Sequence, residues 1–176
     1  GIVRELAAEG AQVLVVDRNR DGAEAVAQET GTLAHQADVS DGDAMSDMAE
    51  AALRAMGHVD ILVNNAGVTH PKGPLEEVAE EAFDRVFAVN CKSVYLTARA
   101  LVPHMKMRKA GAILNVSSTA GISPRAHLNW YNASKGWMNT ATKTMAVELA
   151  PDGIRVNAIN PVAGDTPLLG AFLGED

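Results

Sequence analysis

Apolar runs of strand length alternate with segments of helical periodicity along the whole chain of 176 residues. Such alternation is typical of right-handed crossovers, in which helices cover both faces of a parallel sheet. The first run is continuously apolar, which indicates a strand buried on both faces. The expected strands are Ala11–Asp17, Thr32–Ala37, His58–Val63, Ala112–Ser117 and Ile154–Ile159, and the expected helices are Gly1–Glu9, Arg18–Thr30, about Ser40–Met56, about Glu80–Arg108 and Asn129–Ala150. The sequence therefore predicts an α/β fold, a doubly wound parallel sheet in three α/β/α layers.

The charge balance of the chain is acidic. Lysine and arginine number 15 against 22 aspartates and glutamates, which gives a formal net charge of −7. Such a chain repels phosphate backbones and anionic lipids, so nucleic acids and membranes are not expected partners. No apolar run approaches the roughly 20 residues of a membrane-spanning helix. Cys91 is the single cysteine and the five histidines show no metal-ligand spacing, so we expect a cytoplasmic protein without disulfides or a metal site.

Small polar residues follow every expected strand. In open α/β sheets, ligands bind beyond the carboxyl ends of the strands, so these residues mark a candidate binding edge. The alternative is that they are ordinary loop residues, since loops are polar in most proteins. The residues concerned are Asp17, Asp38, Asn64, Asn65, Ser117, Ser118, Asn160 and Pro161.

A tyrosine and a lysine lie four residues apart at the start of the last expected helix, in Tyr131-Asn-Ala-Ser-Lys135. Residues at this spacing share a helix face. An ammonium group beside a phenol is expected to lower its pKa, and a phenol tuned in this way can exchange a proton with an alcohol oxygen. The spacing alone is a weak signal, but Ser118 lies at a strand end 13 residues earlier and could donate to the same oxygen. Asn90 lies inside a long expected helix, where an amide side chain is neutral to unfavourable for stability unless it has a specific function.

Asp17 closes the first expected strand, where an acidic residue often accepts from the ribose hydroxyls of a dinucleotide. The glycine-rich loop that normally precedes such a residue by about 20 positions would fall before Gly1. We therefore expect that a first strand and its phosphate loop are missing from the displayed sequence. Asp17 favours NAD because a carboxylate repels a 2′-phosphate, whereas Arg18 and Arg20 favour NADP. The alternative is that Asp17 only terminates a strand.

Taken together, these motifs resemble the short-chain dehydrogenase/reductase family, which comprises NAD(P)-dependent oxidoreductases with a Rossmann-like fold. The resemblance extends over essentially the whole chain and implies catalytic roles for four residues. Tyr131 would be the acid/base, Ser118 would polarise the substrate oxygen, Lys135 would tune the tyrosine and bind the nicotinamide ribose, and Asn90 would hold a water in a proton relay. The implied cofactor-binding residues are Asp17, Asp38, Val39, Asn65, Ala66, Gly67, Tyr131, Lys135, Pro161 and Thr166.

The sequence departs from the family pattern at three places. The N-terminal glycine-rich loop is absent, Val162 replaces the usual glycine after Pro161, and the chain stops before the substrate-covering segment and the final strand. Residues 1–176 are therefore expected to form a partial NAD(P)-binding domain, in which the neighbours of a missing central strand have unpaired edges. We expect such a segment alone to lack a cradle for the pyrophosphate.

The resemblance implies hydride transfer between NAD(P) and a secondary alcohol or ketone, with NAD preferred and NADP possible. One alternative is a 3-oxoacyl-(acyl carrier protein) reductase that uses NADPH, and another is a dinucleotide-binding sensor without catalytic activity. A homodimer or homotetramer is implied because the helices that contain Asn90 and Tyr131 carry the subunit contacts in the family. Arg125 and His127 lie in the loop after Ser118, where they could contact an anionic substrate or remain solvated.

Overall fold

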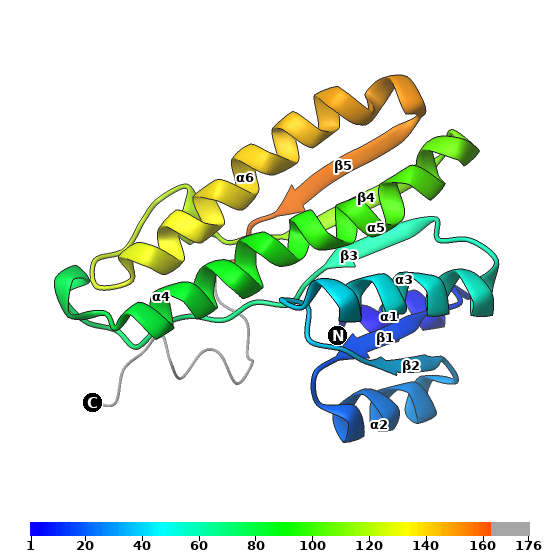
Figure 1. Cartoon of the computed structure of the whole chain (residues 1–176), viewed down its shortest axis with the longest axis horizontal. Coiled ribbons are helices and arrows are strands. Elements are labelled where there is room, and N and C mark those ends of the chain that lie inside the picture. Colours follow the sequence, from blue (N-terminus) through cyan, green and yellow to red (C-terminus); the bar gives the residue numbers. More distant parts are fainter. Residues whose placement is uncertain (163–176) are drawn as a thin grey trace. The chain divides into compact units, whose positions relative to one another are not determined.

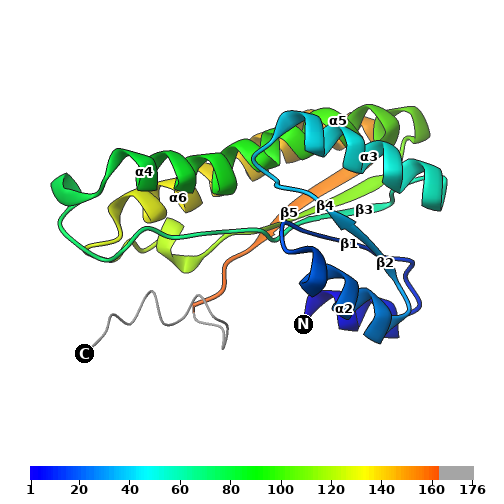
Figure 2. The same ribbon diagram turned by 60° about the horizontal axis from the view of Figure 1, so that its bottom comes forward.

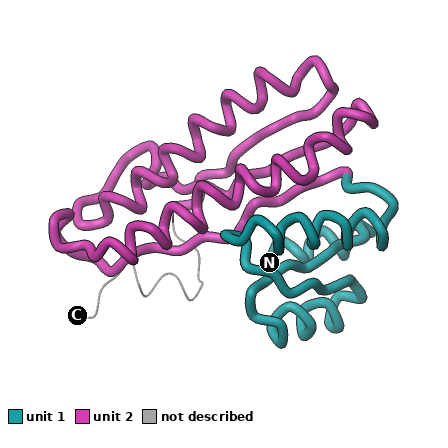
Figure 3. The backbone as a smooth tube through the Cα atoms, in the orientation of Figure 1, with its two compact units in different colours: residues 1–59 teal, residues 60–176 magenta. Residues whose placement is uncertain are grey.

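A computed structural model describes residues 1–162 of the chain. All five expected strands and all five expected helical segments are present, in the expected order (Figure 1). The strands belong to two parallel sheets, of order β1-β2 and β3-β4-β5. The chain divides into two compact units, residues 1–59 and 60–176, which contain one sheet each (Figure 3).

The first unit has a two-stranded parallel sheet between helices. The two strands run in register from the pair Leu14 and Leu33 to the pair Asp17 and Gln36. Helices α1 and α2 lie on one face of this sheet and α3 lies on the other (Figure 2), so this unit has the expected three layers. Its elements are α1 (Ile2–Ala8), β1 (Leu14–Asp17), α2 (Arg20–Thr30), β2 (Leu33–Gln36) and α3 (Gly42–Met56).

The helices of the first unit begin where polar side chains cap them. The Asn19 side chain accepts from the backbone N–H of Gly22 at the start of α2, and the Asp41 side chain accepts from two backbone N–H groups at the start of α3. Such caps satisfy donors that have no partner within the helix. The expectation for β1 was wrong in one respect: Leu14–Val16 are half-buried rather than fully buried.

The second unit has a three-stranded parallel sheet in which β4 pairs with both β3 and β5. Helices α5 and α6 lie on the same face of this sheet (Figure 2). Along β5, Ile154 and Val156 are buried while Arg155 and Asn157 are exposed, which is the alternation of a strand with one covered face. The elements are β3 (Ile61–Asn64), η1 (Leu75–Glu77), α4 (Glu80–Phe87), η2 (Ala88–Lys92), α5 (Ser93–Arg108), β4 (Gly111–Val116), η3 (Thr119–Gly121), α6 (Asn129–Leu149), η4 (Ala150–Asp152) and β5 (Ile154–Ile159).

The expected helix over residues 80–108 is continuous but contains a π-helical segment, η2, between α4 and α5. Asn90 and Cys91 lie in this segment, and both are buried. A π segment inserts an extra residue into the turn and is frequent at functional sites. Hydrophobic periodicity cannot reveal it, because the apolar pattern on either side continues.

A chain of buried side-chain hydrogen bonds connects α5, β3, β4 and α6. Thr97 on α5 donates to Asn64 Oδ1 at 2.9 Å, and Asn64 Nδ2 donates to Asn115 Oδ1 at 2.8 Å. Asn115 Nδ2 donates in turn to Thr142 Oγ1 on α6, at 2.8 Å. A satisfied buried network fixes the relative positions of the elements that carry it. The same four elements, with η2, carry or border the residues of the candidate site.

Within the described residues, β4 has two hydrogen-bonded neighbours and each of the other four strands has one. Within residues 1–162, no helix is long and apolar enough to cross a membrane. The same residues contain no cluster of histidine, cysteine or carboxylate side chains that could bind a metal ion.

Candidate active site

The structure brings together the four residues that were predicted to be catalytic, all in the second unit. Ser118 follows β4, Tyr131 and Lys135 lie in the first two turns of α6, and Asn90 lies in η2. All four are buried, and Asn90 is 0% exposed. Parallel strands place the chain after β4 at the same end of the sheet as the start of α6, which explains why residues far apart in sequence meet here.

Ser118 and Tyr131 interact through their side chains. A hydrogen bond from Ser118 and the positive charge of Arg125 lower the pKa of the Tyr131 phenol, but the larger effect of burial raises it, so the net pKa lies above the usual value of 10.0. The Ser118 hydroxyl oxygen also accepts from the backbone N–H of Ala120, at 3.1 Å. This second bond fixes the serine at the end of β4, so that its hydroxyl faces the phenol.

Lys135 points into the same cluster. Its Nζ donates to the carbonyl oxygen of Val116 at 2.9 Å and lies 5.9 Å from the centre of the Tyr131 ring. Burial lowers the pKa of Lys135 to about 8, although the charge of Cys91 opposes this shift. The expectation that Lys135 lowers the pKa of Tyr131 is therefore wrong for this structure. Desolvation of the phenol dominates, and the ammonium group is directed toward a backbone carbonyl.

Burial of Lys135 has a measurable effect on stability. Between pH 8 and 10.5 the unfolded chain holds a proton that the folded chain has released, so the free energy of unfolding should rise with pH in this window. We expect a rise of up to about 3 kcal/mol relative to Lys135→Met, measured by urea unfolding at a series of pH values. Lys143→Met, which removes an exposed lysine from the same helix, should keep the rise of the wild type. Identical pH dependence in wild type and Lys135→Met would contradict a lowered lysine pKa.

The side chain of Asn90 holds three segments together. Its Oδ1 accepts from the backbone N–H of Val68, and its Nδ2 donates to the Val68 carbonyl and to the Ser134 hydroxyl, each at 2.9 Å. Both amide hydrogens and the amide oxygen thus have protein partners. The Asn90 side chain therefore positions the loop after β3 against α6, while the predicted water relay stays a prediction.

Gly67 lies against this cluster. A Cβ atom at this position would be 3.4 Å from Lys135 Nζ and 3.6 Å from Asn90 Oδ1, so a larger side chain would fill the space beside the lysine. The ammonium group of Lys135 has three N–H bonds, and the Val116 carbonyl accepts one of them. The remaining N–H donors of Lys135 match the neighbouring hydroxyl groups of a ribose, as a nicotinamide dinucleotide carries.

The other predicted cofactor residues are distributed over both units. Asp17 is exposed at the end of β1, and its Oδ1 accepts from the backbone N–H of Asn19 at 2.8 Å. Asp38 Oδ1 accepts from the N–H and the hydroxyl of Ser40, and Val39 next to it is half-buried. In the second unit, Asn65 and Ala66 are exposed after β3, and the Pro161 carbonyl accepts from the Thr119 N–H at 3.1 Å. Thr166 lies outside the described residues.

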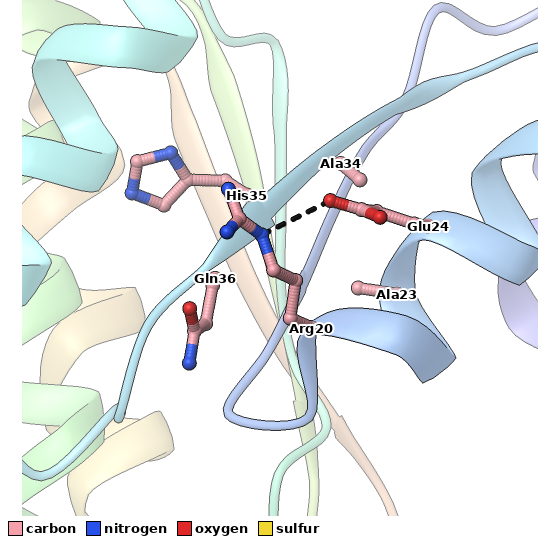
Figure 4. A pocket seen from close by; sticks show the side chains of 6 residues that line it. All are labelled: Arg20, Ala23, Glu24, Ala34, His35 and Gln36. Atoms are coloured by element: carbon pink, nitrogen blue, oxygen red, sulfur yellow. Dashed lines mark hydrogen bonds and ion pairs between the residues drawn. The ribbon is translucent and has the colours of Figure 1, made fainter.

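A small hollow of about 270 Å³ lies between α2 and β2 in the first unit (Figure 4). Arg20 donates to Glu24 at its rim, at 3.1 Å, so this arginine is already paired with a carboxylate. Asp17, Asp38 and Val39 do not line the hollow, which is therefore separate from the predicted cofactor residues. The lining residues are Arg20, Ala23, Glu24, Ala34, His35 and Gln36.

Two residues of the site were missed by sequence reasoning. Ser134 is 0% exposed, accepts from Asn90 and donates to the Tyr131 carbonyl at 2.7 Å. Gly121 passes so close to α6 that a Cβ atom there would lie 2.5 Å from the carbonyl carbon of Lys135. A polar residue inside the apolar face of α6 was the available signal for Ser134, whereas nothing local distinguishes Gly121 from an ordinary loop glycine.

The short chain dehydrogenase family model matches residues 1–173. The chain is 42% identical to 4-formylbenzenesulfonate dehydrogenase of Comamonas testosteroni, in an alignment that covers 98% of this chain and 71% of that protein. Among solved structures it resembles a 3-ketoacyl-(acyl-carrier-protein) reductase from Brucella melitensis complexed with NADH, with a TM-score of 0.94, 50% identity, and coverage of 96% of this chain and 72% of that one. It also resembles a metagenomic short-chain oxidoreductase in complex with NADP, with a TM-score of 0.86, 38% identity, and coverage of 92% and 76%.

These similarities cover nearly all of this chain and a smaller part of its relatives. Across eight curated relatives, the chain spans between 54% and 71% of their length. The family model, the sequence identities and the α/β fold all agree with the family that the sequence motifs indicated. The chain belongs to the short-chain dehydrogenase/reductase family, whose members are NAD(P)-dependent oxidoreductases.

Proposed function

We propose that this protein transfers a hydride between a nicotinamide dinucleotide and the carbon of a secondary alcohol or ketone. The observation that carries the proposal is the buried cluster in which the Ser118 hydroxyl meets the Tyr131 phenol, with Lys135 Nζ 5.9 Å from the tyrosine ring. A phenol, a hydroxyl and an amine in one place can move a proton and polarise an oxygen atom. A nicotinamide dinucleotide supplies or accepts the hydride when it is bound.

The side chains of the cluster have separate roles in this proposal. In the reduction direction, Tyr131 donates its proton to the carbonyl oxygen as negative charge develops there. Ser118 donates a hydrogen bond to the same oxygen, which favours the charged transition state over the neutral ketone. In the oxidation direction, the phenolate of Tyr131 accepts the hydroxyl proton of the alcohol. Lys135 holds ribose hydroxyls through its remaining N–H donors, while Asn90 keeps the loop of Gly67 against α6.

The experiment that tests this proposal is an assay of absorbance at the usual ~340 nm signal of the reduced cofactor, with a panel of ketones and secondary alcohols. It uses the protein encoded by the complete open reading frame. Cofactor-dependent turnover of at least one compound is expected. Cofactor binding without any turnover would favour the alternative of a dinucleotide-binding sensor and contradict the proposal.

A 3-oxoacyl-(acyl carrier protein) reductase is the second candidate within the same class. The specific observation in its favour is the 50% identity to the Brucella melitensis reductase. In the same panel, 3-oxoacyl thioesters should be reduced much faster than simple ketones if this candidate holds. Equal rates with both compound classes would speak against it.

We propose NAD as the preferred cofactor, with NADP as a possible substitute. Solved relatives bind NADH and NADP, so the preference must come from this chain's own residues. The Asp17 carboxylate is exposed and accepts from the Asn19 N–H, and Arg20 forms an exposed ion pair with Glu24. The negative charge of Asp17 disfavours a 2′-phosphate, and its carboxylate can accept a hydrogen bond from a free 2′-hydroxyl.

A substitution of Asp17 tests the cofactor preference. We expect kcat/KM to be higher with NAD than with NADP, and Asp17→Ser to reduce this ratio roughly tenfold or more by removing the repulsion. Glu9→Ser, which removes one exposed carboxylate elsewhere in the same unit, serves as the charge-matched control. Equal or higher efficiency of the wild type with NADP would refute the preference.

We also propose that residues 1–176 are part of one dinucleotide-binding domain, and that the protein forms a homodimer or homotetramer. Exposed apolar side chains on α5 and α6 support the second point: Tyr95 is 53% exposed, Trp137 41% and Val147 78%. Large exposed apolar side chains on neighbouring helices are typical of subunit contacts. Sedimentation equilibrium of the complete protein should show a dimer or tetramer, and a monomer at micromolar concentration would contradict it.

A further inference from the structure

Charge is distributed unevenly along this acidic chain. Residues 85–147 contain no aspartate or glutamate, although the whole chain has 22 of them. The same stretch contains nine of the 15 lysines and arginines. It includes η2, α5, β4, η3 and most of α6, which are the elements that carry Asn90, Ser118, Tyr131 and Lys135. Three of these cations are paired with carboxylates from outside the stretch, Lys106 and Lys109 with Asp152 and Arg108 with Asp60. A positive charge that stays unpaired near a site attracts ligands of the opposite sign.

Arg125 is an exposed cation in the loop that leads into α6, the helix of Tyr131. It lies in the loop between η3 and α6, and its positive charge acts on the Tyr131 side chain. Two hydrogen bonds fix the backbone of this loop at Arg125 and His127. Asn132 Nδ2 donates to the Arg125 carbonyl at 2.7 Å, and the Gly73 N–H donates to the His127 carbonyl at 3.1 Å. The backbone of Arg125 is therefore held against α6, the helix that carries Tyr131.

The guanidinium group of Arg125 is available for a ligand. Arg4, Arg20, Arg54 and Arg108 pair with carboxylates, but within residues 1–162 no carboxylate pairs with Arg125. Lys135 cannot take the same role, because it is buried and donates to the Val116 carbonyl. A planar guanidinium with several N–H donors matches a carboxylate or a similar oxyanion group.

We propose that Arg125 selects substrates that carry an oxyanion group such as a carboxylate, binding that group while the alcohol or carbonyl carbon of the same molecule lies at Tyr131. The inference rests on the proposed function and adds a substrate class to it. Arg125 would bind the charged group of the substrate away from the reacting carbon. This interaction should therefore stabilise the bound substrate and the transition state equally, and its loss should change mainly KM.

The test compares two ketone probes, 4-acetylbenzoate and its methyl ester, which differ in charge and by one methyl group, with the complete protein and reduced cofactor. We expect Arg125→Gln to lower kcat/KM for the acid roughly tenfold to a hundredfold, as for the loss of a charge-assisted hydrogen bond, mainly through KM. The ester should change less than about threefold, since the same acid/base group serves both probes. Any effect of Arg125 on proton transfer by Tyr131 is common to both probes, so it cancels in the ratio of their kcat/KM values.

Two controls make the result specific. Lys143→Gln removes an exposed positive charge from α6 outside the Tyr131 cluster and should leave the acid-to-ester ratio unchanged, and Arg125→Lys should retain part of the preference. Salt provides a measurement without any variant: raising ionic strength should lower kcat/KM for the acid much more than for the ester. If Arg125→Gln lowered kcat/KM equally for both probes, or for neither, the inference would be overturned while the proposed function stayed intact. Absence of turnover with every ketone and alcohol would overturn both.

Discussion

Tyr131→Phe is expected to reduce kcat by roughly a thousandfold, within the range that general acid–base catalysis contributes. The substitution removes one oxygen atom from a ring that is 4% exposed, so the packing around it should persist. Without the phenol, the substrate oxygen loses the proton donor that is hydrogen-bonded to Ser118. Ser118 can polarise that oxygen, but its hydroxyl is a far weaker acid than the phenol.

Binding measurements separate this loss from a defect in folding or cofactor affinity. The dissociation constant of the reduced cofactor, measured by fluorescence titration, should change less than about threefold in Tyr131→Phe, since Lys135 and Gly67 are retained. Ser118→Ala should lose less activity than Tyr131→Phe, because polarisation is weakened while the proton donor remains. Substantial turnover by Tyr131→Phe would show that another group moves the proton.

Gly121→Ala is expected to have the largest effect of any single methyl group added near the site. Its Cβ atom would lie 2.5 Å from the Lys135 carbonyl carbon, 2.7 Å from the Gly136 nitrogen and 2.8 Å from the Lys135 carbonyl oxygen. All three are backbone atoms of α6, so no side-chain rotation can relieve the contact. We expect a loss of about 1–3 kcal/mol in the free energy of unfolding, together with loss of turnover as the Ser118 loop moves away from Tyr131.

The facing glycine is the matched control for this experiment. A Cβ atom on Gly136 would lie 3.6 Å from the Gly121 carbonyl oxygen, which is an ordinary contact distance. Since Gly136 lies inside α6, an alanine there should stabilise the helix by up to about 1 kcal/mol. Urea unfolding of the two variants should therefore give shifts of opposite sign. Equal destabilisation by both would contradict the close approach of Gly121 to the Lys135 backbone.

The strands and helices could be predicted well because their signals are local. The apolar runs before Asp17 and Asn64 form β1 and β3, although β1 begins at Leu14 and β3 at Ile61 rather than at the expected Ala11 and His58. The periodic segment that begins at Asn129 forms α6 and continues to Leu149. Periodicity records which side of an element is buried, and this information is sufficient to place elements along the chain.

Features that depend on distant partners could not be predicted. Asn64 and Asn115 are 51 residues apart, and their hydrogen bond has no signature in either local pattern. The π segment around Asn90 is similarly invisible. The predicted lowering of the Tyr131 pKa was wrong. A four-residue spacing indicates which groups are near, but not how deeply a phenol is buried or where an ammonium group points.

The central claim is that the cluster of Ser118, Tyr131 and Lys135 supports hydride transfer to a carbonyl carbon. The most direct measurement uses NADH carrying deuterium on one face of nicotinamide C4, prepared separately for each face, with the complete protein and a ketone that it reduces. We predict that the product alcohol carries deuterium on its carbinol carbon with one of the two labelled cofactors and not with the other. Oxidation of NADH without deuterium in the alcohol from either preparation would contradict the account.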